Sequence, residues 1–473
     1  MTYPDATRFY IDGRWSEPHG SDQADIVNPA TGKAIGKIAL GSASDAERAI
    51  AAARKAFPAW SATPVEERIA VLERILAGLM QRQADIGDAI MTEMGAPKSL
   101  AHQLQAAMGP AHFGETIRVA RDFAFEKQVG TTLVQREGIG VCVLITPWNW
   151  PMNQVAAKVA PALAAGCTMV LKPSELAPLS AVILAEILDE AGVPPGVFNM
   201  VHGRGPDIGD ALTAHPDVDM VSFTGSTRAG IAIGHNGADR VKRVSLELGG
   251  KSANIIAPDA DLATAIPQSV AACMRNSGQS CNAPTRLLVP RDRLDEVSAL
   301  ARSAAAALRV GAPESDPDLG PIANETQYRR VLSMIEKGQA EGATLITDAQ
   351  QPAAGDGYFV APTIFCDVTP DMTIAREEVF GPVLAIIAYD DIDEAIAIAN
   401  DSDYGLSGYV WAGSQGSATD IARRLRTGMV HVNNAGPDVA APFGGYKMSG
   451  NGREWGVYGL EEFLEVKSIF GGG

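Results

Sequence analysis

Residues 139–172 read IGVCVLITPWNWPMNQVAAKVAPALAAGCTMVLK, in which two apolar runs flank a segment with helical spacing. The first run, IGVCVLIT, is continuously apolar, which is typical of a strand buried on both faces of a parallel sheet. A helix is predicted from about Met152 to Ala165, and the strand CTMVLK follows it. A strand, a helix and a second strand at this spacing predict one unit of a doubly wound α/β sheet.

The same alternation continues beyond this unit. A helix from Leu179 to Ala191 ends at Gly192, and the strands VFNMV, DMVSFT and RVSLEL follow with helices between them. Beyond Gly249, further strands are predicted at NII, RLLVP, TLIT, PVLAIIAY, SGYVW and GMVHV. The chain is therefore predicted to contain two doubly wound α/β domains, which its length of 473 residues also favours.

Two strand-like segments, Phe125–Arg136 and Phe463–Phe470, lie outside this alternation and could pair as a small extra sheet, including between subunits. Near the N-terminus, RFYIDGRW predicts a hairpin that turns at Asp12-Gly13, and helical spacing extends over residues 45–60 and 64–94. The predicted division is a cofactor domain of 1–121 with 139–249, a catalytic domain of 250–449, and oligomerisation segments 122–138 and 450–473.

Charge and cysteine content exclude several classes of function. With 39 basic and 56 acidic residues, the net charge of −17 repels phosphate, so nucleic acids and anionic membranes are not expected as partners. No signal peptide is expected, and the apolar run from Val155 to Leu171 contains Lys158 and Pro161 and is too short to span a membrane. The five cysteines form no C-x-x-C pair, which argues against zinc or a disulfide framework and favours a cytoplasmic location.

Loops at predicted strand ends have features of a cofactor site. FTGSTRAG follows a strand and opens a helix, so Gly225, Ser226 and the first helical amides can hold a pyrophosphate, although a plain turn would look the same. HGRGPDIG is a degenerate dinucleotide fingerprint that fits a structural turn better. LKPSE places Lys172 and Glu175 where open α/β sheets bind ligands, while a solvated ion pair is the simpler interpretation of this stretch alone.

One cysteine lies in a polar loop. NSGQSCNAPTR, residues 276–286, surrounds Cys281 with small and turn-forming residues, and a reactive thiolate needs such a polar, partly exposed setting. LELGG places Glu247 at a strand end before two glycines, where a carboxylate could act as a base for water. TPWNWP places Asn149 at the end of the first strand, where its amide could donate to a developing oxyanion.

The chain resembles the aldehyde dehydrogenase superfamily over essentially its whole length. The resemblance is carried by motifs in family order: PWNWP, LKPSE, FTGST, LELGGKS, GQSC, EEVFGPV and PFGGYKMSGNGRE. It implies an α/β fold with a Rossmann-like cofactor domain, a catalytic domain and a small oligomerisation sheet, assembled as a homodimer or homotetramer. It also implies NAD as the cofactor, a small-molecule aldehyde as the substrate, and no metal.

The resemblance assigns the chemistry to a few residues. Cys281 would attack the carbonyl, and the thiohemiacetal oxyanion would be held by Asn149 and the Cys281 amide. Hydride would leave to the nicotinamide, and water activated by Glu247 would hydrolyse the resulting thioester to the acid. Lys158 would assist proton movement.

The resemblance also implies a cofactor set and a substrate set. Lys172 and Glu175 would bind the adenosine ribose, and Gly225 with Ser226 would meet the pyrophosphate. Glu378 and Phe380 would hold the nicotinamide ribose, and the remaining residues predicted to contact the cofactor are Thr146, Trp148, Gly205 and Leu248. The residues predicted to frame the substrate entrance are Trp150, Asn153, Gln154 and Asn282, with Ser280 and 435–437.

Several alternatives are weighed against this interpretation. Acylating relatives that use coenzyme A generally lack the glutamate found here at 247, and a thiol sensor without activity would not need a nucleophile, a base and an oxyanion donor together. A semialdehyde dehydrogenase of a catabolic pathway is the alternative that stays open.

The predicted specificity follows from two features. Glu175 would repel a 2′-phosphate, which predicts NAD over NADP. The segment 435–437 is small and no arginine occupies the substrate positions, so bulky neutral aldehydes are expected to outperform acetaldehyde and acidic semialdehydes, unless a neighbouring loop fills the space.

Overall fold

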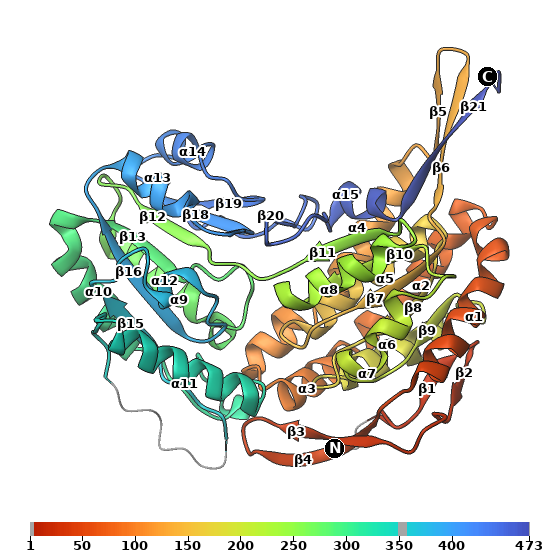
Figure 1. Ribbon diagram of the computed structural model, residues 1–473, viewed down its shortest axis with the longest axis horizontal. Helices are drawn as coiled ribbons and strands as arrows, with labels where there is room; N and C mark the ends of the chain where they lie inside the picture. The colour runs from red at the N-terminus through yellow and green to blue at the C-terminus, as the bar shows by residue number, and fades with distance from the viewer. Residues whose placement is uncertain (1–3, 349–356, 473) are drawn as a thin grey trace.

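The computed structural model describes residues 4–348 and 357–472. The ends of the predicted ranges (1–3 and 473) and the stretch 349–356 lie outside the described residues. The chain is a mixed α/β structure with two seven-stranded sheets and smaller antiparallel sheets, as predicted (Figure 1). The alternation of strands and helices predicted from residue 139 to residue 248 is confirmed.

The first sheet has the strand order β11-β10-β7-β8-β9-β1-β2, and the strands from β11 to β9 are parallel. Their bounds are β7 (Val141–Ile145), β8 (Thr168–Lys172), β9 (Phe198–Met200), β10 (Met220–Thr224) and β11 (Arg243–Glu247). The hairpin of β1 (Phe9–Ile11) and β2 (Arg14–Ser16) turns at Asp12-Gly13 as predicted, because both turn residues adopt positive φ.

Helices cover both faces of this sheet. One face carries α1 (Ala43–Ser61), α7 (Gly205–Thr213) and α8 (Thr227–Ala238). The other carries α2 (Val65–Gln81), α3 (Gln83–Glu93), α4 (Met108–Asp122), α5 (Pro151–Ala165) and α6 (Leu179–Glu190). Along β7, Val141 and Val143 pack on the first side and Cys142 and Leu144 on the second, which is why the strand is a continuous apolar run.

The second sheet has the order β14-β15-β16-β13-β12-β18-β19 and is parallel except for β14. Its strands are β12 (Ala253–Ile256), β13 (Arg286–Pro290), β14 (Thr344–Leu345), β15 (Thr363–Cys366), β16 (Val383–Tyr389), β18 (Ser407–Trp411) and β19 (Met429–Val432). Its helices are α9 (Leu262–Met274), α10 (Leu294–Ala306), α11 (Glu325–Ala340), α12 (Thr373–Arg376), α13 (Ile392–Asn400) and α14 (Gln415–Ala422).

A few predicted elements differ from the structure. The helix predicted over 64–94 is interrupted at Arg82, whose backbone leaves the helical region while its guanidinium pairs with Glu186 of α6. The predicted strand TLIT is reduced to Thr344–Leu345, and β15 was not predicted. Among the described residues, no helix combines the length and the apolarity needed to cross a membrane.

The small extra sheet is confirmed as a three-stranded antiparallel sheet that projects from the body (Figure 1). It consists of β5 (Glu126–Val129), β6 (Thr132–Gly138) and β21 (Leu464–Phe470), with β6 in the middle. Four of its apolar side chains are exposed, namely Val129, Val466, Ile469 and Phe470, and Phe470 at the end of β21 is 85% exposed. A separate hairpin of β3 (Gln23–Asn28) and β4 (Lys33–Ala39) lies near the N-terminus.

Residues 443–454, called here the covering segment, lie along β11, the edge strand of the first sheet. The Leu248 amide donates to the Ser449 carbonyl at 2.9 Å, and the Asn451 amide donates to the Leu246 carbonyl at 3.1 Å. The segment contains β20 (Tyr446–Lys447), which pairs with β17 (Tyr404–Gly405), and is followed by α15 (Gly456–Glu462). It closes the free edge of β11 where Glu247 ends the strand.

Candidate active site

A cleft of about 620 Å³, a volume typical of ligand sites, contains residues from both halves of the chain. Nine of the predicted site residues line it: Trp148, Asn149, Gln154, Gly225, Ser226, Leu248, Cys281, Glu378 and Phe380. The predicted residues that do not contribute to its described lining are Thr146, Trp150, Asn153, Lys158, Lys172, Glu175, Gly205, Glu247 and Asn282.

The loop that carries Cys281 connects α9 to β13 and opens with a strained turn. Asn276, Ser277 and Gly278 have φ values of 55°, 55° and 71°, in the left-handed region that non-glycine residues rarely adopt. A side chain at position 278 would also overlap the carbonyl oxygen of Gly381, so only glycine fits there without displacing backbone. The turn reverses the chain after α9 and brings Cys281 to the cleft.

Hydrogen bonds from distant segments hold this turn. Asn276 Oδ1 accepts from Gln105 Nε2 at 3.0 Å. Ser277 and Gln279 bind the backbone of the segment 320–323, with distances of 2.8 Å from Ser277 Oγ to a carbonyl and 2.9 Å from an amide to Gln279 Oε1. Asn276 and Gln279 are 2% and 0% exposed, so the polar side chains of this loop point inward.

Cys281 is half-buried, and its surroundings oppose ionisation of the thiol. Burial raises the pKa of Cys281, and the carboxylates of Glu378 and Glu247 raise it further. The backbone amides of Asn282 and of Cys281 itself lower this pKa. The prediction that the polar loop favours a reactive thiol stays a prediction: burial and the two carboxylates oppose the thiolate, and the two backbone amides favour it.

Asn149 follows β7 and is fixed against the same loop. Its Nδ2 donates to the Gln279 carbonyl at 3.1 Å, and its backbone carbonyl accepts from Asn276 Nδ2 at 2.9 Å. A side-chain amide nitrogen carries two hydrogens, so the second is free to donate to an oxygen bound at Cys281. This orientation suits an oxyanion donor.

Glu247 ends β11 beneath the covering segment and is 2% exposed. Neither of its carboxylate oxygens has a hydrogen-bond partner among the described residues. Burial raises the pKa of Glu247 well above its ordinary value, and the Glu454 carboxylate raises it further, against the opposing charge of Lys158. An unpartnered carboxylate with a raised pKa can take a proton from water near neutral pH.

Lys158 on α5 lies in a buried ion pair beside Glu247. Its Nζ donates to Ser222 Oγ at 3.0 Å and forms the ion pair with Glu454 of the covering segment. Both charged side chains are nearly inaccessible to solvent, with exposed fractions of 1% and 8%. Glu454 was not predicted as a site residue, since it lies 296 residues from Lys158 in the sequence.

Two glycines at the end of the LELGG motif admit another carboxylate. The Gly250 amide donates to Glu378 Oε1 at 2.9 Å, and a side chain at Gly249 would overlap the Glu378 carboxylate. Burial raises the pKa of Glu378 to about 7, and the Gly250 amide opposes this rise. Phe380 packs edge to face against Trp148, with ring centroids 5.5 Å apart. The predicted nicotinamide-side residues therefore form one wall of the cleft.

The carboxyl ends of β7 to β10 form the rim where ligands of open α/β sheets bind. Buried polar atoms without a partner among the described residues gather there: Thr146 Oγ1, Thr224 Oγ1 and both ring nitrogens of His202. Burial lowers the pKa of His202 to about 3, so its ring is neutral. Because buried polar groups nearly always have partners, this rim fits a polar ligand such as a dinucleotide.

The other predicted cofactor residues flank the rim. Lys172 ends β8, is 3% exposed, and lies 3.3 Å from Glu175 Oε2, so this is not a solvated surface pair. Ser226 is the N-cap of α8 and lines the cleft at the helix start, where backbone amides attract anions. Gly205 begins α7 and is exposed.

The predicted substrate residues preceding Cys281 are bound to neighbours. Trp150 Nε1 donates to Ser280 Oγ at 2.8 Å. Asn153 Oδ1 lies 2.8 Å from His112 Nε2, and His112 was not predicted. Gln154 is buried and lines the cleft together with the cofactor residues.

The predicted substrate residues after Cys281 come from the second sheet and its loops. Asn282 is half-buried, and its carbonyl accepts a hydrogen bond from the Tyr409 hydroxyl at 2.9 Å. The segment 435–437 is exposed. These small and neutral residues place no positive charge at this side of the nucleophile.

The sequence analysis did not predict several residues that line the cleft. Gln327 and Arg330 lie one turn apart on α11, and they donate to the carbonyls of Phe380 and Glu378 at 2.9 Å and 3.1 Å. Their helical spacing was visible, but nothing local connects α11 with the EEVFGPV motif. The other unpredicted lining residues are Pro147, Thr224, Thr227, Arg228, Gly249 and Tyr404.

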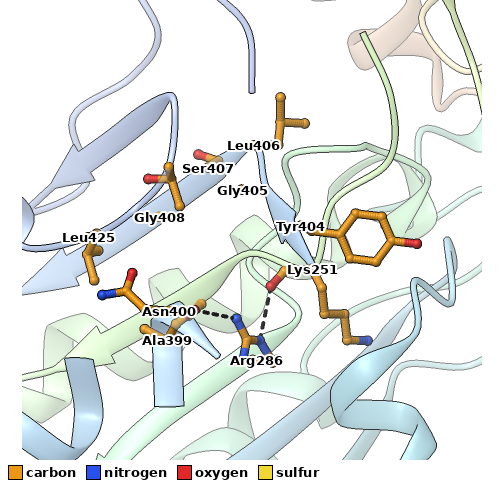
Figure 2. A pocket seen from close by; sticks show the side chains of 12 residues that line it. Lys251, Arg286, Ala399, Asn400, Tyr404, Gly405, Leu406, Ser407, Gly408 and Leu425 are labelled. Atoms are coloured by element: carbon orange, nitrogen blue, oxygen red, sulfur yellow. Dashed lines mark hydrogen bonds between the residues drawn. The ribbon is translucent and has the colours of Figure 1, made fainter. Parts of the chain in front are cut away.

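A smaller cavity of about 10 Å³ lies between Lys251, Arg286 and the start of β18 (Figure 2). Arg286 donates to the backbone carbonyls of Lys251 and Ala399, each at 3.0 Å, as Figure 2 shows. The space is too small for a substrate, and all three guanidinium nitrogens of Arg286 donate to backbone carbonyls. Among the described residues, no group of three or more His, Cys, Asp or Glu side chains is placed to hold a metal ion.

The chain is similar to known proteins over nearly its whole length. The profile of the Aldehyde dehydrogenase family matches residues 15–469. A 3-succinoylsemialdehyde-pyridine dehydrogenase from a Pseudomonas species is 56% identical over 471 residues, which cover 99% of each chain. Aldehyde dehydrogenase C from Pseudomonas syringae, in complex with NAD+ and octanal, has a TM-score of 0.96 and 52% identity, covering 99% of this chain and 97% of that one. An indole-3-acetaldehyde dehydrogenase from Pseudomonas syringae, in complex with NAD+ and IAA, has a TM-score of 0.96 and 36% identity over 99% and 97% of the two chains.

Proposed function

The chain belongs to the aldehyde dehydrogenase family as an NAD-dependent oxidoreductase, and we propose that it oxidises bulky, uncharged aldehydes to their acids with Cys281 as the nucleophile. The observation that carries the residue assignments is the convergence of distant segments on one cleft. Cys281 and Asn149 line that cleft, and the buried, unpartnered carboxylate of Glu247 lies close enough to raise the pKa of the Cys281 thiol.

The steps at the carbonyl are assigned to side chains and amides of this chain. Cys281 Sγ attacks the carbonyl carbon as the thiolate, after its proton has passed to solvent. The second hydrogen of Asn149 Nδ2 and the Cys281 amide donate to the resulting oxyanion. After hydride transfer, Glu247 deprotonates the water that attacks the thioester, and release of the acid restores Sγ. The Lys158–Glu454 pair gives Glu247 a neighbour through which the proton leaves.

The residues of the rim fit NAD, which accepts the hydride when bound. We assign the adenosine ribose to Lys172 and Glu175, the pyrophosphate to Gly225 and Ser226, and the nicotinamide ribose to Glu378. The fit is supported by the unpartnered polar atoms along the rim, which can bind hydroxyl and phosphate oxygens. The remaining members of the proposed cofactor set are Thr146, Trp148, Gly205, Leu248 and Phe380.

The substrate class is supported by the residues around Cys281 and by the relatives. The predicted substrate positions carry an indole, amides and small residues, and none is cationic. Relatives that cover nearly the whole chain are a dehydrogenase of a pyridine-bearing semialdehyde and an enzyme complexed with octanal. The aldehydes of both relatives are larger than acetaldehyde and lack a carboxylate, which supports the proposal.

A second candidate follows from the relative at 56% identity. A semialdehyde dehydrogenase of a catabolic pathway would act on an aldehyde whose far end carries a carbonyl function. A neutral, aryl-bearing semialdehyde satisfies both candidates, whereas succinic semialdehyde, with its carboxylate, satisfies only this second one.

We further propose that the parts of the chain divide these tasks. Residues 1–121 with 139–249 would bind NAD, 250–449 would carry Cys281, and 122–138 with 450–473 would join subunits of a homodimer or homotetramer in the cytoplasm. The exposed apolar side chains of the three-stranded sheet support its role in assembly.

The test is a side-by-side measurement of kcat/KM with NAD for acetaldehyde, octanal, benzaldehyde, indole-3-acetaldehyde, a pyridyl-ketone semialdehyde and succinic semialdehyde. We expect the large neutral aldehydes to exceed acetaldehyde by at least about tenfold, because each additional buried methylene contributes roughly 0.8 kcal/mol. A preference for acetaldehyde or for succinic semialdehyde would refute the proposed substrate class.

A further inference from the structure

Two aromatic side chains hold the residues on either side of Cys281. Trp150, at the start of α5, donates from Nε1 to Ser280 Oγ at 2.8 Å. Tyr409, on β18 of the second sheet, donates from its hydroxyl to the Asn282 carbonyl at 2.9 Å. Trp150 already belongs to the proposed substrate set, whereas Tyr409 has no role in the function proposed above.

The ring of Tyr409 is fixed by its neighbour on the adjacent strand. Tyr409 and His431 are register partners in the parallel pair β18–β19, and their rings stack with centroids 4.6 Å apart and planes at 14°. His431 Nδ1 lies 2.8 Å from the Ala435 carbonyl oxygen, which can only accept, so Nδ1 carries the proton. The imidazole is thereby tethered by a hydrogen bond on its edge and by the stack on its face.

Asn282 connects Tyr409 to the thiol of Cys281. The Asn282 amide is one of the two backbone groups that favour the Cys281 thiolate against burial. The carbonyl of the same residue is the group that Tyr409 binds. A hydrogen bond at this carbonyl restricts the backbone of Asn282 and hence the direction of its amide. Burial also raises the pKa of Tyr409, so its hydroxyl remains a donor at neutral pH.

We propose that Tyr409 is a positioning residue whose hydroxyl fixes Asn282 so that the Asn282 amide stays directed at Sγ of Cys281. His431 holds the ring of Tyr409 in the orientation that this bond requires. The inference rests on the proposed role of Cys281 as the nucleophile, and it adds residues of the second sheet to those that prepare the thiol.

The test compares two substitutions that each remove one tyrosine hydroxyl from the same sheet. Tyr409→Phe keeps the stacked ring and removes the hydroxyl that donates to the Asn282 carbonyl and also interacts with Ser407. Tyr389→Phe is the matched control, because the Tyr389 hydroxyl donates to the Ile256 carbonyl at 2.6 Å and not to the loop that carries Cys281. The readouts are the pH dependence of Cys281 alkylation by iodoacetamide, with Cys281→Ala as the background, and kcat and KM for aldehyde and NAD.

We expect Tyr409→Phe to slow alkylation at neutral pH by about 3- to 10-fold and to move the alkylation profile to higher pH. The kcat/KM for aldehyde should fall by a similar factor, and KM for NAD should stay unchanged. Tyr389→Phe should match the wild type in all of these. An alkylation profile of Tyr409→Phe that overlays the wild type, or an equal change in Tyr389→Phe, would overturn the proposal.

A second variant tests the stack. His431→Ala should shift alkylation in the same direction, and its combination with Tyr409→Phe should add little, since both act through one contact. Fully additive effects would overturn the role assigned to His431. Dehydrogenase activity retained in Cys281→Ala would instead refute the nucleophile assignment, so the two failures are distinguishable.

Discussion

The loop that carries Cys281 and the rim of the first sheet differ in whether their polar side chains have hydrogen-bond partners within the protein. In the loop before Cys281, polar side chains have hydrogen-bond partners within the protein: Asn276, Ser277, Gln279 and Ser280. Along the rim and the adjoining strand, buried polar side chains contain atoms with no partner among the described residues: Thr146, His202, Thr224 and Glu247.

This difference separates two tasks. A side chain with a protein partner is held before any ligand arrives, so the loop is preorganised for the reaction. A buried polar atom without a protein partner costs on the order of 1–3 kcal/mol, which a ligand or a water molecule can offset. We therefore expect substitutions in the loop to change stability and kcat, and substitutions along the rim to change the affinity for ligands.

The largest effect is expected from Cys281→Ala, which removes Sγ but none of the hydrogen bonds that shape the loop. Aldehyde oxidation should fall by at least about 10⁴-fold, because the site offers no second nucleophile. The thermal midpoint and NAD affinity, measured by calorimetry, should match the wild type. Residual dehydrogenase activity above this limit in the purified variant would refute the assignment.

Glu247→Gln tests the role of the Glu247 carboxylate. Like the polar groups of the rim, this carboxylate has no partner among the described residues, but we propose that it acts as the base for water. Steady-state kcat should fall by about 10²- to 10⁴-fold, while rapid mixing should still show a burst of NADH from the first turnover, because the amide cannot activate water. Because the pKa of Glu247 is raised, its basic form is lost as pH falls, so wild-type kcat should decline toward acidic pH.

In Glu247→Gln, the residual rate of deacylation should not decline toward acidic pH. A folded variant that binds NAD but produces no burst would contradict a role confined to deacylation.

The choice between NAD and NADP tests the rim directly. The 2′-phosphate of NADP would lie against the Glu175 carboxylate at a cost on the order of 1–3 kcal/mol, so kcat/KM should favour NAD by about 5- to 150-fold. Glu175→Gln should narrow this ratio, because buried Lys172 would then face the phosphate without a competing charge. Equal use of both nucleotides by the wild type would remove Glu175 from the proposed set.

The smallest effects are expected from two substitutions that should each change a different quantity: one the free energy of unfolding, the other the affinity for NAD. Ser277→Ala removes a hydrogen bond to the Gly320 carbonyl and should lower the free energy of unfolding by about 1 kcal/mol, with NAD affinity unchanged. Thr224→Val replaces an unpartnered buried hydroxyl by a methyl group, so stability should be kept or gained while KM for NAD rises about 3- to 10-fold. If both variants changed the same quantity, the contrast between loop and rim would be wrong.

Much of the fold could be predicted because it depends on local pattern. The continuous apolar runs of β7, β8 and β10 reflect burial on both faces, and the turn at Asp12-Gly13 has its own sequence signature. The strands that were missed or overestimated, β15 and β14, are short and lie near one edge of the second sheet, where pattern is weakest. The break at Arg82 depends on a partner in α6, which no local pattern encodes.

The identity of the candidate site residues could be predicted because each lies in a sequence motif. Their hydrogen bonds and pKa values could not, because these depend on residues far apart in the sequence. Cys281, Asn149 and Glu247 stand in recognisable motifs; the first two line the cleft, and Glu247 lies close enough to raise the pKa of Cys281. The hydrogen bond from Gln105 to Asn276 joins residues 171 positions apart, so no local pattern predicts it. The raised pKa of Cys281 was missed for the same reason, since burial and neighbouring carboxylates are properties of the assembled fold.

The covering segment has a consequence for the order in which the protein is made. Glu247 belongs to an edge strand that emerges from the ribosome near the middle of synthesis, whereas residues 443–454 emerge close to its end. Domains fold as units from the N-terminus, so the first sheet can form while the backbone groups of β11 are still open to unintended strand pairing. Glu247, the proposed catalytic base, therefore reaches its final surroundings only when the chain is nearly complete, and a product truncated before residue 443 would carry Cys281 without an enclosed Glu247.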